Sequence, residues 1–532
     1  MTLHSQTSLN GGRTEVCYRL RRMRPSRVAL RQALGSLLGV VLFTAPLPGQ
    51  LAPKARRQLD SLIDAAPYNR TLWGVALVDD GGRLLYGRNP DRLFIPASNT
   101  KLVVSSVAAA LLAPDWTVMT SLYAAGPVRD GVVAGDLVLY GRGDPTFSRR
   151  CYATDTTLPG ACEADPSARW RELAAGLSRR GVRRILGDLV GDGSWFDPEL
   201  VHPSWGNYDL NWWYAAPVSG LGFNDNSVDI GWGPGPAVDA PARLTLDPDL
   251  GDVFLENRTV TVATGGESDI GDRMYRVPGT LQLWAEGTVA LNSRGGTESF
   301  ALPDPNLYAA RAFRRALQDA GISVLGSTRS TTDSLRYHSA RETAPLAESR
   351  SRPLRDWIFP ILNTSQNWFA DMLLKQLGRQ FGAAGSWSAG LDIEGRFLID
   401  SVGIDSTLFA LSDGSGLAGS NLVAPLAFAQ LLRFIRHHPH FAASVLPGLP
   451  QSGVRGSLRN RFVGTPLEGR VHAKSGSIAR VNTLSGYFEL ADGRTYTFSV
   501  QANHHAEANR RTLDTIDSLV VRMAQAVGRR SR

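Results

Sequence analysis

The sequence predicts an α/β (α+β) fold, in which an antiparallel sheet flanked by helices is interrupted by a large β-rich insertion. Two hairpin signals, one near each end of the chain, predict the sheet, because short apolar runs flank turn-forming Asp and Gly residues there. Helical patterns at 52–66 and 506–527 lie outside these hairpins and would pack on the sheet. The apolar runs span 72–78, 83–86, 483–490 and 495–502.

The middle of the chain predicts the insertion. Short alternating runs between turn signals, with a Gly-, Pro- and Thr-rich span at 231–303, indicate β structure, and 168–179 has a helical pattern. Helical patterns return at 307–320, 365–377 and 425–437. We therefore divide the chain into a leader at 1–49, a first part of the sheet domain at 50–118, inserted structure at 119–320 and a second part of the sheet domain at 321–532.

Charge is concentrated at the start of the chain. The 532 residues include 57 Lys plus Arg and 49 Asp plus Glu, a formal net charge of +8. Seven arginines and one glutamate before residue 32 account for most of this excess. The remainder is nearly neutral and has no basic cluster interleaved with aromatic residues, so nucleic acid is not expected as a partner.

The arginine-rich start is followed by an apolar segment at 34–47 and by small residues near Ala45 and Gly49. This order is typical of a secretory signal peptide, and the apolar segment is short for a membrane span. A disordered basic tail followed by a core helix is the alternative. We expect export to the periplasm or cell-wall space, with at most loose membrane association.

Cysteine usage agrees with export. Cys17 would leave with the signal peptide, and Cys151 and Cys162 then form the remaining pair. In an oxidising compartment we expect a disulfide between them, and two free buried thiols are the alternative.

Ser98 and Lys101 stand at the start of a helical run that ends before Pro114. Residues three apart share a helical face, so the Lys101 ammonium can reach the Ser98 hydroxyl. A capping serine and a surface lysine are the ordinary alternative. Lysine is scarce, however, and a buried lysine can act as a base where arginine cannot. The four lysines are Lys54, Lys101, Lys375 and Lys474.

Two further clusters follow in the second half of the chain. Ser365 and Asn367 have S-x-N spacing ahead of a helical pattern, and Lys474-Ser475-Gly476 ends a strand-like run. Each cluster alone is weak, because capping and ordinary strand ends produce the same residues. In the order S-x-x-K, S-x-N, K-S-G they match the active-site motifs of penicillin-binding proteins and serine β-lactamases.

The flanking residues resemble the D-Ala-D-Ala carboxypeptidase/endopeptidase family, the class C low-molecular-weight penicillin-binding proteins. The similarity covers nearly all of the chain after the leader, and it implies a transpeptidase/β-lactamase-like domain with an insertion between the first two motifs. Two departures are K-S-G in place of the usual K-T-G, and Arg142 within a glycine-rich motif. The supporting segments are Ile95–Ser98, Gly141–Pro145, Gly187–Asp192, Ala216–Ser219, Phe223–Asn224 and Ser412–Leu417.

The resemblance implies a serine D-Ala-D-Ala carboxypeptidase, with endopeptidase activity left open, that acts on peptidoglycan stem peptides and is acylated by β-lactam antibiotics. Ser98 would attack the peptide carbonyl, and Lys101 would accept its proton, helped by burial and the nearby cation Lys474. Ser365 would relay a proton to the leaving amine, and Asn367 would hold Lys101 and the substrate amide. Lys474 and Ser475 would bind the terminal carboxylate, and the N–H groups of Ser98 and Ser477 would form the oxyanion hole.

Weaker expectations concern residues outside the three motifs. Asp144 resembles a position that faces the peptide stem, with a turn-forming aspartate as the alternative. Ser415 and Gly416 would line the edge of the pocket, or form a plain turn, and His472 is expected to be structural. No residues have metal-ligand spacing and no phosphate loop is present, so no metal or cofactor is expected.

Three other functions are weighed against this one. A serine β-lactamase would deacylate penicillins quickly, and the long insertion argues against it. A related esterase would more often carry tyrosine in place of Ser365. A catalytically silent cell-wall binding protein would not need three intact motifs.

Overall fold

The sheet predicted from both ends of the chain is present in the computed structural model, which describes residues 50–277 and 279–529. Its strands are ordered β2-β1-β22-β21-β20 and every neighbouring pair is antiparallel. Because β1 pairs with β22, the first and last strands meet inside the sheet and β20 is left at an edge. The strands are β1 (Leu72–Val78), β2 (Leu84–Arg88), β20 (Val471–Ile478), β21 (Val481–Glu489) and β22 (Thr495–Asn503). The expected signal peptide at 1–49, with Cys17, lies outside the described residues.

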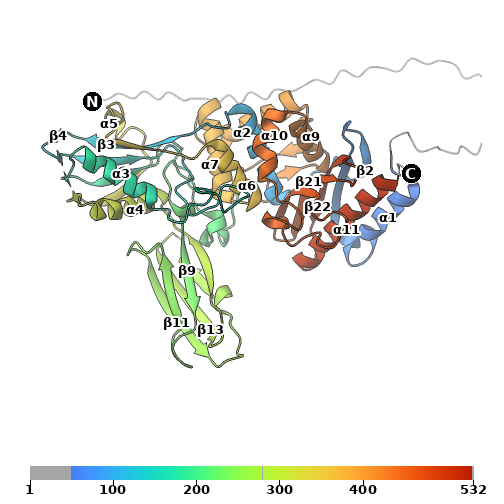
Figure 1. The fold of residues 1–532 in the computed structure, drawn as a ribbon, viewed down its shortest axis with the longest axis horizontal. Coiled ribbons are helices and arrows are strands. Elements are labelled where there is room, and N and C mark those ends of the chain that lie inside the picture. The colour runs from blue at the N-terminus through green and yellow to red at the C-terminus, as the bar shows by residue number, and fades with distance from the viewer. Residues whose placement is uncertain (1–49, 278, 530–532) are drawn as a thin grey trace, which may run out of the picture. The chain divides into compact units, whose positions relative to one another are not determined.

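Helices cover both faces of this sheet (Figure 1). Successive strand residues point to opposite faces, so Val75 and Leu77 pack with α1 (Pro53–Asp64) and α11 (Asn509–Gly528). Ala76 and Val78 belong to a separate cluster with Ala429 of α9 (Pro425–Arg436). The terminal helices therefore form one outer layer and α9 begins the other.

The second layer is a cluster of helices around α2 (Lys101–Leu111). Nine of the eleven residues of α2 are buried, as expected for a helix whose residues are mostly apolar. A short 3-10 helix, η2 (Ala97–Thr100), precedes α2 and contacts β20 and β21. Ser98 and Lys101 therefore lie at the boundary between the sheet and the helical layer. The surrounding helices are α6 (Leu354–Asn363), α7 (Asn367–Phe381), α8 (Trp387–Arg396) and α10 (Pro439–Val445), and the short strands β18 (Phe409–Ala410) and β19 (Leu422–Val423) pair beside them.

The inserted region contains a mixed sheet with the order β16-β8-β6-β3-β17 and helices α3 (Ala168–Arg179) and α4 (Pro305–Asp319). Its strands are β3 (Met119–Ala125), β6 (Asp136–Tyr140), β8 (Leu189–Asp192), β16 (Thr328–Thr331) and β17 (Ala347–Arg350). A smaller sheet has the order β15-β7-β5-β4, formed by β4 (Val128–Arg129), β5 (Val132–Val133), β7 (Arg184–Ile185) and β15 (Ser323–Val324). Helix α5 (His338–Arg341) lies between β16 and β17 in the chain.

Two three-stranded sheets complete the insertion, as the β-rich pattern predicts (Figure 1). One has the order β10-β9-β14, formed by β9 (Ser227–Gly233), β10 (Arg243–Asp247) and β14 (Gly296–Ala301). The other has the order β11-β13-β12, formed by β11 (Phe254–Val262), β12 (Met274–Arg276) and β13 (Gln282–Ala290).

The sheets of the insertion continue past residue 320. Strands β15, β16 and β17 lie after that residue, yet they pair with β7, β8 and β3, which lie before it. A boundary at 320 would divide both sheets. We therefore propose that the insertion ends at Arg350, immediately before α6.

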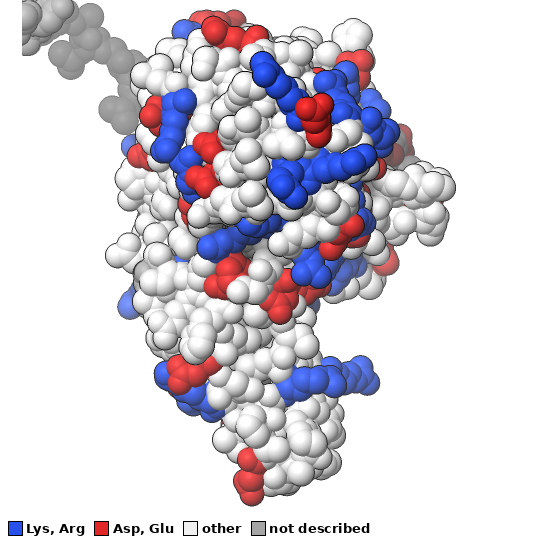
Figure 2. Space-filling model, turned by 90° about the vertical axis from the view of Figure 1, so that its left-hand side faces the viewer, with Lys and Arg blue, Asp and Glu red and all other residues white. Residues whose placement is uncertain are grey.

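The insertion packs into the helical layer. Tyr152, Phe196 and Trp205 share a buried cluster with Trp357 of α6 and Phe369 of α7. On the face drawn in Figure 2, positive and negative side chains are mixed, consistent with the nearly neutral body expected from the composition. Within residues 50–277 and 279–529, the helices are all too short or too polar to cross a membrane.

Candidate active site

Ser98 and Lys101 are in direct contact at the start of α2. The Lys101 ammonium donates to the Ser98 hydroxyl at 2.9 Å. Ser98 lies in η2, and no side chain caps the start of η2 or of α2. The Ser98 hydroxyl is therefore not a helix cap, which was the alternative explanation for a serine at this position. Ala97, immediately before it, has a φ of +46°, a conformation that non-glycine residues adopt at a cost.

Lys101 is fully buried and has two more acceptors. Its Nζ donates at 2.6 Å to Asn367 Oδ1 and at 2.6 Å to the Ser415 carbonyl. The Asn367 amide is oriented by its other end, which donates from Nδ2 to the Tyr214 carbonyl at 2.7 Å. The first and second motifs and the loop at 412–418 therefore meet at one ammonium group.

Burial lowers the pKa of Lys101 to about 7, and the carboxylates of Asp371 and Asp413 oppose this shift. At neutral pH, a substantial fraction of Lys101 therefore carries no proton and can accept one.

Buried carboxyl groups lie behind Lys101. Asp371 Oδ1 accepts from Trp387 Nε1 at 3.0 Å and from the Gly414 N–H at 2.9 Å. Asp413 accepts from the backbone N–H groups of Gly416 and Ala418, and from side chains that include Trp205 Nε1. Burial and neighbouring carboxylates raise the pKa values of Asp371 and Glu394. Asp413 thus shapes the loop whose Ser415 carbonyl holds Lys101.

A second cation, Lys474, faces the second motif. Its Nζ donates to Ser365 Oγ at 2.9 Å and to the Ser475 carbonyl at 2.6 Å. Burial and the charge of Lys101 lower the pKa of Lys474. Ser365 has a φ of +63°, so its backbone is strained two residues before α7. Ser475 Oγ is 2.7 Å from Ser457 Oγ.

The free edge of β20 presents backbone donors to this site. The N–H groups of Val471 and Ala473 donate to Ser452 Oγ and to the Pro450 carbonyl, respectively, on the side of β20 away from β21. Since backbone donors alternate along a strand, the N–H groups of Ser475 and Ser477 point to the same edge. A Cβ at Gly476 would lie 2.9 Å from the Ser98 nitrogen, so glycine permits η2 to approach this edge.

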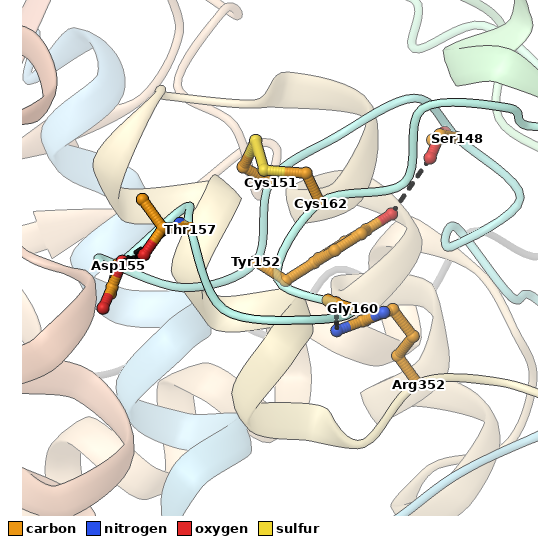
Figure 3. The surroundings of a disulfide bond; sticks show 8 residues. All are labelled: Ser148, Cys151, Tyr152, Asp155, Thr157, Gly160, Cys162 and Arg352. Carbon is orange, nitrogen blue, oxygen red and sulfur yellow. Dashed lines mark hydrogen bonds between the residues drawn. A yellow bond between two sulfur atoms is a disulfide. The ribbon is translucent and has the colours of Figure 1, made fainter.

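The structure also locates the residues singled out beyond the three motifs. Asp144 is buried, and its carboxylate accepts from the Arg169 guanidinium and from the Thr146 N–H. Ser415 joins the site through its carbonyl, because its hydroxyl donates to Asp413. Arg142 contacts β3 through the Met119 carbonyl, Ser121 Oγ and Tyr123 OH. Cys151 and Cys162 form a disulfide (Figure 3).

No group of three or more His, Cys, Asp or Glu side chains in the described residues could hold a metal ion. His472 is half-buried on β20, where burial lowers the pKa of its imidazole.

Sequence reasoning missed part of this site. Asp371 lies four residues after Asn367, on the same face of α7, and this spacing could have indicated it. Asp413 lies within the Ser412–Leu417 segment but had no assigned role. Nothing in the sequence indicated Glu394, because a glutamate in a helical pattern is usually exposed.

The family model described as D-Ala-D-Ala carboxypeptidase 3 (S13) matches residues 55–525. A D-alanyl-D-alanine carboxypeptidase from an Actinomadura species is 30% identical over 506 residues, covering 93% of this chain and 88% of the relative. The D-alanyl-D-alanine carboxypeptidase DacB of Haemophilus influenzae is 24% identical over 479 residues, covering 88% of this chain and 92% of the relative.

Solved structures are similar in fold. A crystal structure of penicillin binding protein 4 (dacB) from Haemophilus influenzae superposes with a TM-score of 0.73 at 20% identity, covering 88% of this chain and 99% of that chain. A structure of the same protein complexed with a β-lactam has a TM-score of 0.68 at 20% identity, covering 89% of this chain and 98% of that chain. At this identity the likeness supports the fold.

Proposed function

Because this chain belongs to the D-Ala-D-Ala carboxypeptidase 3 (S13) family and is a penicillin-sensitive serine carboxypeptidase, we propose that Ser98 is its nucleophile and Lys101 its general base. The observation that carries this proposal is the contact between the Ser98 hydroxyl and the buried Lys101 ammonium, whose pKa is lowered to about 7. A serine hydroxyl needs such a base, since it is a weak nucleophile at its ordinary pKa.

In the acylation step, Ser98 Oγ attacks the carbonyl carbon between the two terminal D-alanines while Lys101 Nζ takes the hydroxyl proton. The N–H groups of Ser98 and Ser477 stabilise the resulting oxyanion, and each such donor contributes about 3 kcal/mol in measured enzymes. The carbon–nitrogen bond then breaks as a proton passes through Ser365 to the amine, and D-alanine leaves. Water hydrolyses the remaining acyl ester and restores the Ser98 hydroxyl.

The leaving D-alanine is held by its carboxylate. Lys474 and Ser475 supply an ammonium and a hydroxyl at the end of the site that includes Ser365. An arriving carboxylate favours the protonated form of Lys474, which opposes the effect of burial on its pKa. Asn367 supports the substrate amide while it orients Lys101.

The substrates of this site are peptidoglycan stem peptides that end in D-Ala-D-Ala, and β-lactam antibiotics acylate the same serine. The family membership and the basic, then apolar, leader at 1–49 support an exported enzyme of the periplasm or cell-wall space.

Release of D-alanine from a stem pentapeptide tests these roles. Ser98→Ala and Lys101→Met are expected to lower kcat by at least about a thousandfold, since each removes a group that takes part in bond formation. Lys54→Met, which alters an exposed lysine on α1, is the matched control and should retain full activity. Retained activity in Lys101→Met would exclude Lys101 as the base.

A further inference from the structure

The hydroxyl of Ser475, which is assigned above to the substrate carboxylate, is paired with a second hydroxyl. Ser475 Oγ lies 2.7 Å from Ser457 Oγ, and within the described part of the chain neither hydroxyl has another hydrogen-bond partner. Ser457 lies in the 3-10 helix η10 (Gly456–Leu458), and its side chain is exposed, whereas Ser475 is half-buried. Two hydroxyl groups from separate segments therefore meet at the carboxylate end of the site.

The segment that carries Ser457 is built along the free edge of β20. The Ala473 N–H donates to the Pro450 carbonyl at 3.1 Å, and the Ser452 N–H donates to the Val471 carbonyl at 3.0 Å. These bonds attach residues 450–452 to the edge of the sheet. The segment then turns and returns to the same strand, because η10 also contacts β20.

The turn before Ser457 is held in place on both sides. Gly456 has a φ of +63°, and a Cβ there would lie 2.7 Å from the Asn363 carbonyl oxygen, so glycine lets η10 pack against the end of α6. Leu458 is fully buried in the apolar cluster that contains residues from the strands of the sheet. The Arg455 guanidinium donates to Gln451 Oε1 and to the carbonyls of Pro447 and Leu449. Ser457 is therefore presented to β20 from a fixed position.

The chemistry of a carboxylate sets the direction of this hydroxyl pair. An ionised carboxylate only accepts hydrogen bonds, so Ser475 must give it the one hydrogen of its hydroxyl. The Ser475 oxygen is then left with lone pairs, and Ser457 is the neighbour that can donate to them. A hydroxyl that accepts one hydrogen bond donates a stronger one. The pair therefore forms a chain from Ser457 through Ser475 to the carboxylate.

The Ser475 side chain also needs an outside constraint. Serine lacks the second Cβ substituent that makes threonine stiff about χ1, so its hydroxyl can rotate among three staggered positions. The bond from Ser457 stabilises one of these positions and leaves the Ser475 hydrogen free for a ligand.

We propose that Ser457 is a positioning residue for the terminal carboxylate of the substrate: its hydroxyl donates to Ser475 Oγ and holds Ser475 in the rotamer that donates to the carboxylate. This role rests on the function proposed above, because the carboxylate is assigned there to Lys474 and Ser475. Ser457 acts through Ser475 and takes no part in bond formation.

Release of D-alanine from a stem pentapeptide tests this role. Ser457→Ala is expected to raise KM by about threefold to tenfold, the worth of one hydrogen bond, and to keep kcat within about twofold. This division is expected because the carboxylate is held alike in the bound substrate and in the transition state. Ser61→Ala, which alters an exposed serine on α1, is the control and should leave both constants unchanged.

Two changes at position 475 separate a positioning role from a structural one. In the Ser475→Ala protein, Ser457→Ala should raise KM no further, because the hydroxyl that it holds is absent. In the Ser475→Thr protein, Ser457→Ala should raise KM by less than about twofold, because threonine is stiff about χ1 without help.

An increase in KM of the same size in all three backgrounds, or no increase with the native Ser475, would overturn the role of Ser457. A fall in kcat at unchanged KM would also overturn it. Should Ser475→Thr fail to fold, the Ser475→Ala pair decides alone. If Ser475→Ala itself leaves KM unchanged, the carboxylate assignment in the proposed function is wrong. A KM that rises in Ser475→Ala but not in Ser457→Ala rejects only the role of Ser457.

Discussion

At the residue scale, the proposed general base Lys101 is expected to determine how the activity depends on pH. Only the neutral amine can accept the Ser98 proton, and burial lowers the pKa of this amine to about 7. The rate constant of acylation by benzylpenicillin is therefore expected to rise as the pH increases through about 7 and then to level off. Stopped-flow measurements between about pH 5 and about pH 9 check this. A rate constant that falls with rising pH over this range would exclude a neutral Lys101 as the base.

Asp413 also affects the pKa of Lys101. Its carboxylate raises the pKa of Lys101, so Asp413→Asn is expected to move the midpoint of the rate profile to lower pH. Asp405→Asn, which alters an aspartate that caps η8 (Ser406–Leu408), is the control and should leave the midpoint in place. A midpoint that moves to higher pH would contradict the assigned effect of Asp413.

Lys101 and Lys474 could be predicted as site residues because lysine is rare in this chain. Of the four lysines, Lys101, Lys375 and Lys474 are fully buried, and only Lys54 is exposed. Lys375 belonged to no motif, and the structure explains it by an ion pair with Asp197 at 2.7 Å. Glu394 could not be predicted, since its role depends on burial behind α7 rather than on any local pattern.

At the element scale, the loop at 413–418 must approach η2 closely. Gly416 has a φ of +80°, and a Cβ there would lie 1.9 Å from the Ala97 carbonyl oxygen. Gly416→Ala is therefore expected to destabilise the fold by about 2–4 kcal/mol and to slow acylation by at least about a hundredfold. Thermal unfolding and the acylation rate measure the two effects.

Gly419, one residue after this loop, offers a matched control. No atom lies within 4 Å of a Cβ built there, and Gly419 has no positive φ. Gly419→Ala should therefore leave both stability and acylation nearly unchanged. If Gly416→Ala behaves like Gly419→Ala, the close approach of the loop to η2 is not required for activity.

Long helices and hairpins with a regular apolar pattern could be predicted from the sequence. Short connecting elements could not. The two hairpins and helices such as α9 and α11 lie where their patterns predict, because apolar spacing is a local property. The 3-10 turn of η2 was not predicted, because Ser98 was expected to open the helix itself. Its conformation depends on contacts with β20 and β21, which are far away in the sequence.

At the scale of the whole molecule, the insertion supports the active site. The Tyr214 carbonyl orients Asn367, Trp205 donates to Asp413 at 2.9 Å, and Asp197 pairs with Lys375. Replacing residues 119–350 by a short linker is therefore expected to abolish labelling by fluorescent penicillin. Circular dichroism would show whether the remaining chain keeps its helices. A shortened chain that is labelled at the wild-type rate would show that the insertion is not needed for acylation.

The presence of the insertion could be predicted, but its end could not. The long separation of the S-x-x-K and S-x-N motifs indicated where it lies, whereas β16 is a polar tetrapeptide, Thr-Arg-Ser-Thr, without a strand-like apolar pattern. Its pairing with β8 is a long-range contact. Strand pairing of this kind is determined by tertiary structure rather than by local propensity.

The most direct test of the central claim is labelling of the purified protein by a fluorescent penicillin, followed by peptide mapping of the adduct. The account predicts one labelled peptide that contains Ser98, no label in Ser98→Ala, and unchanged labelling in Ser105→Ala, which alters a buried serine of α2. Label retained by a folded Ser98→Ala protein would contradict the assignment of Ser98 as the nucleophile.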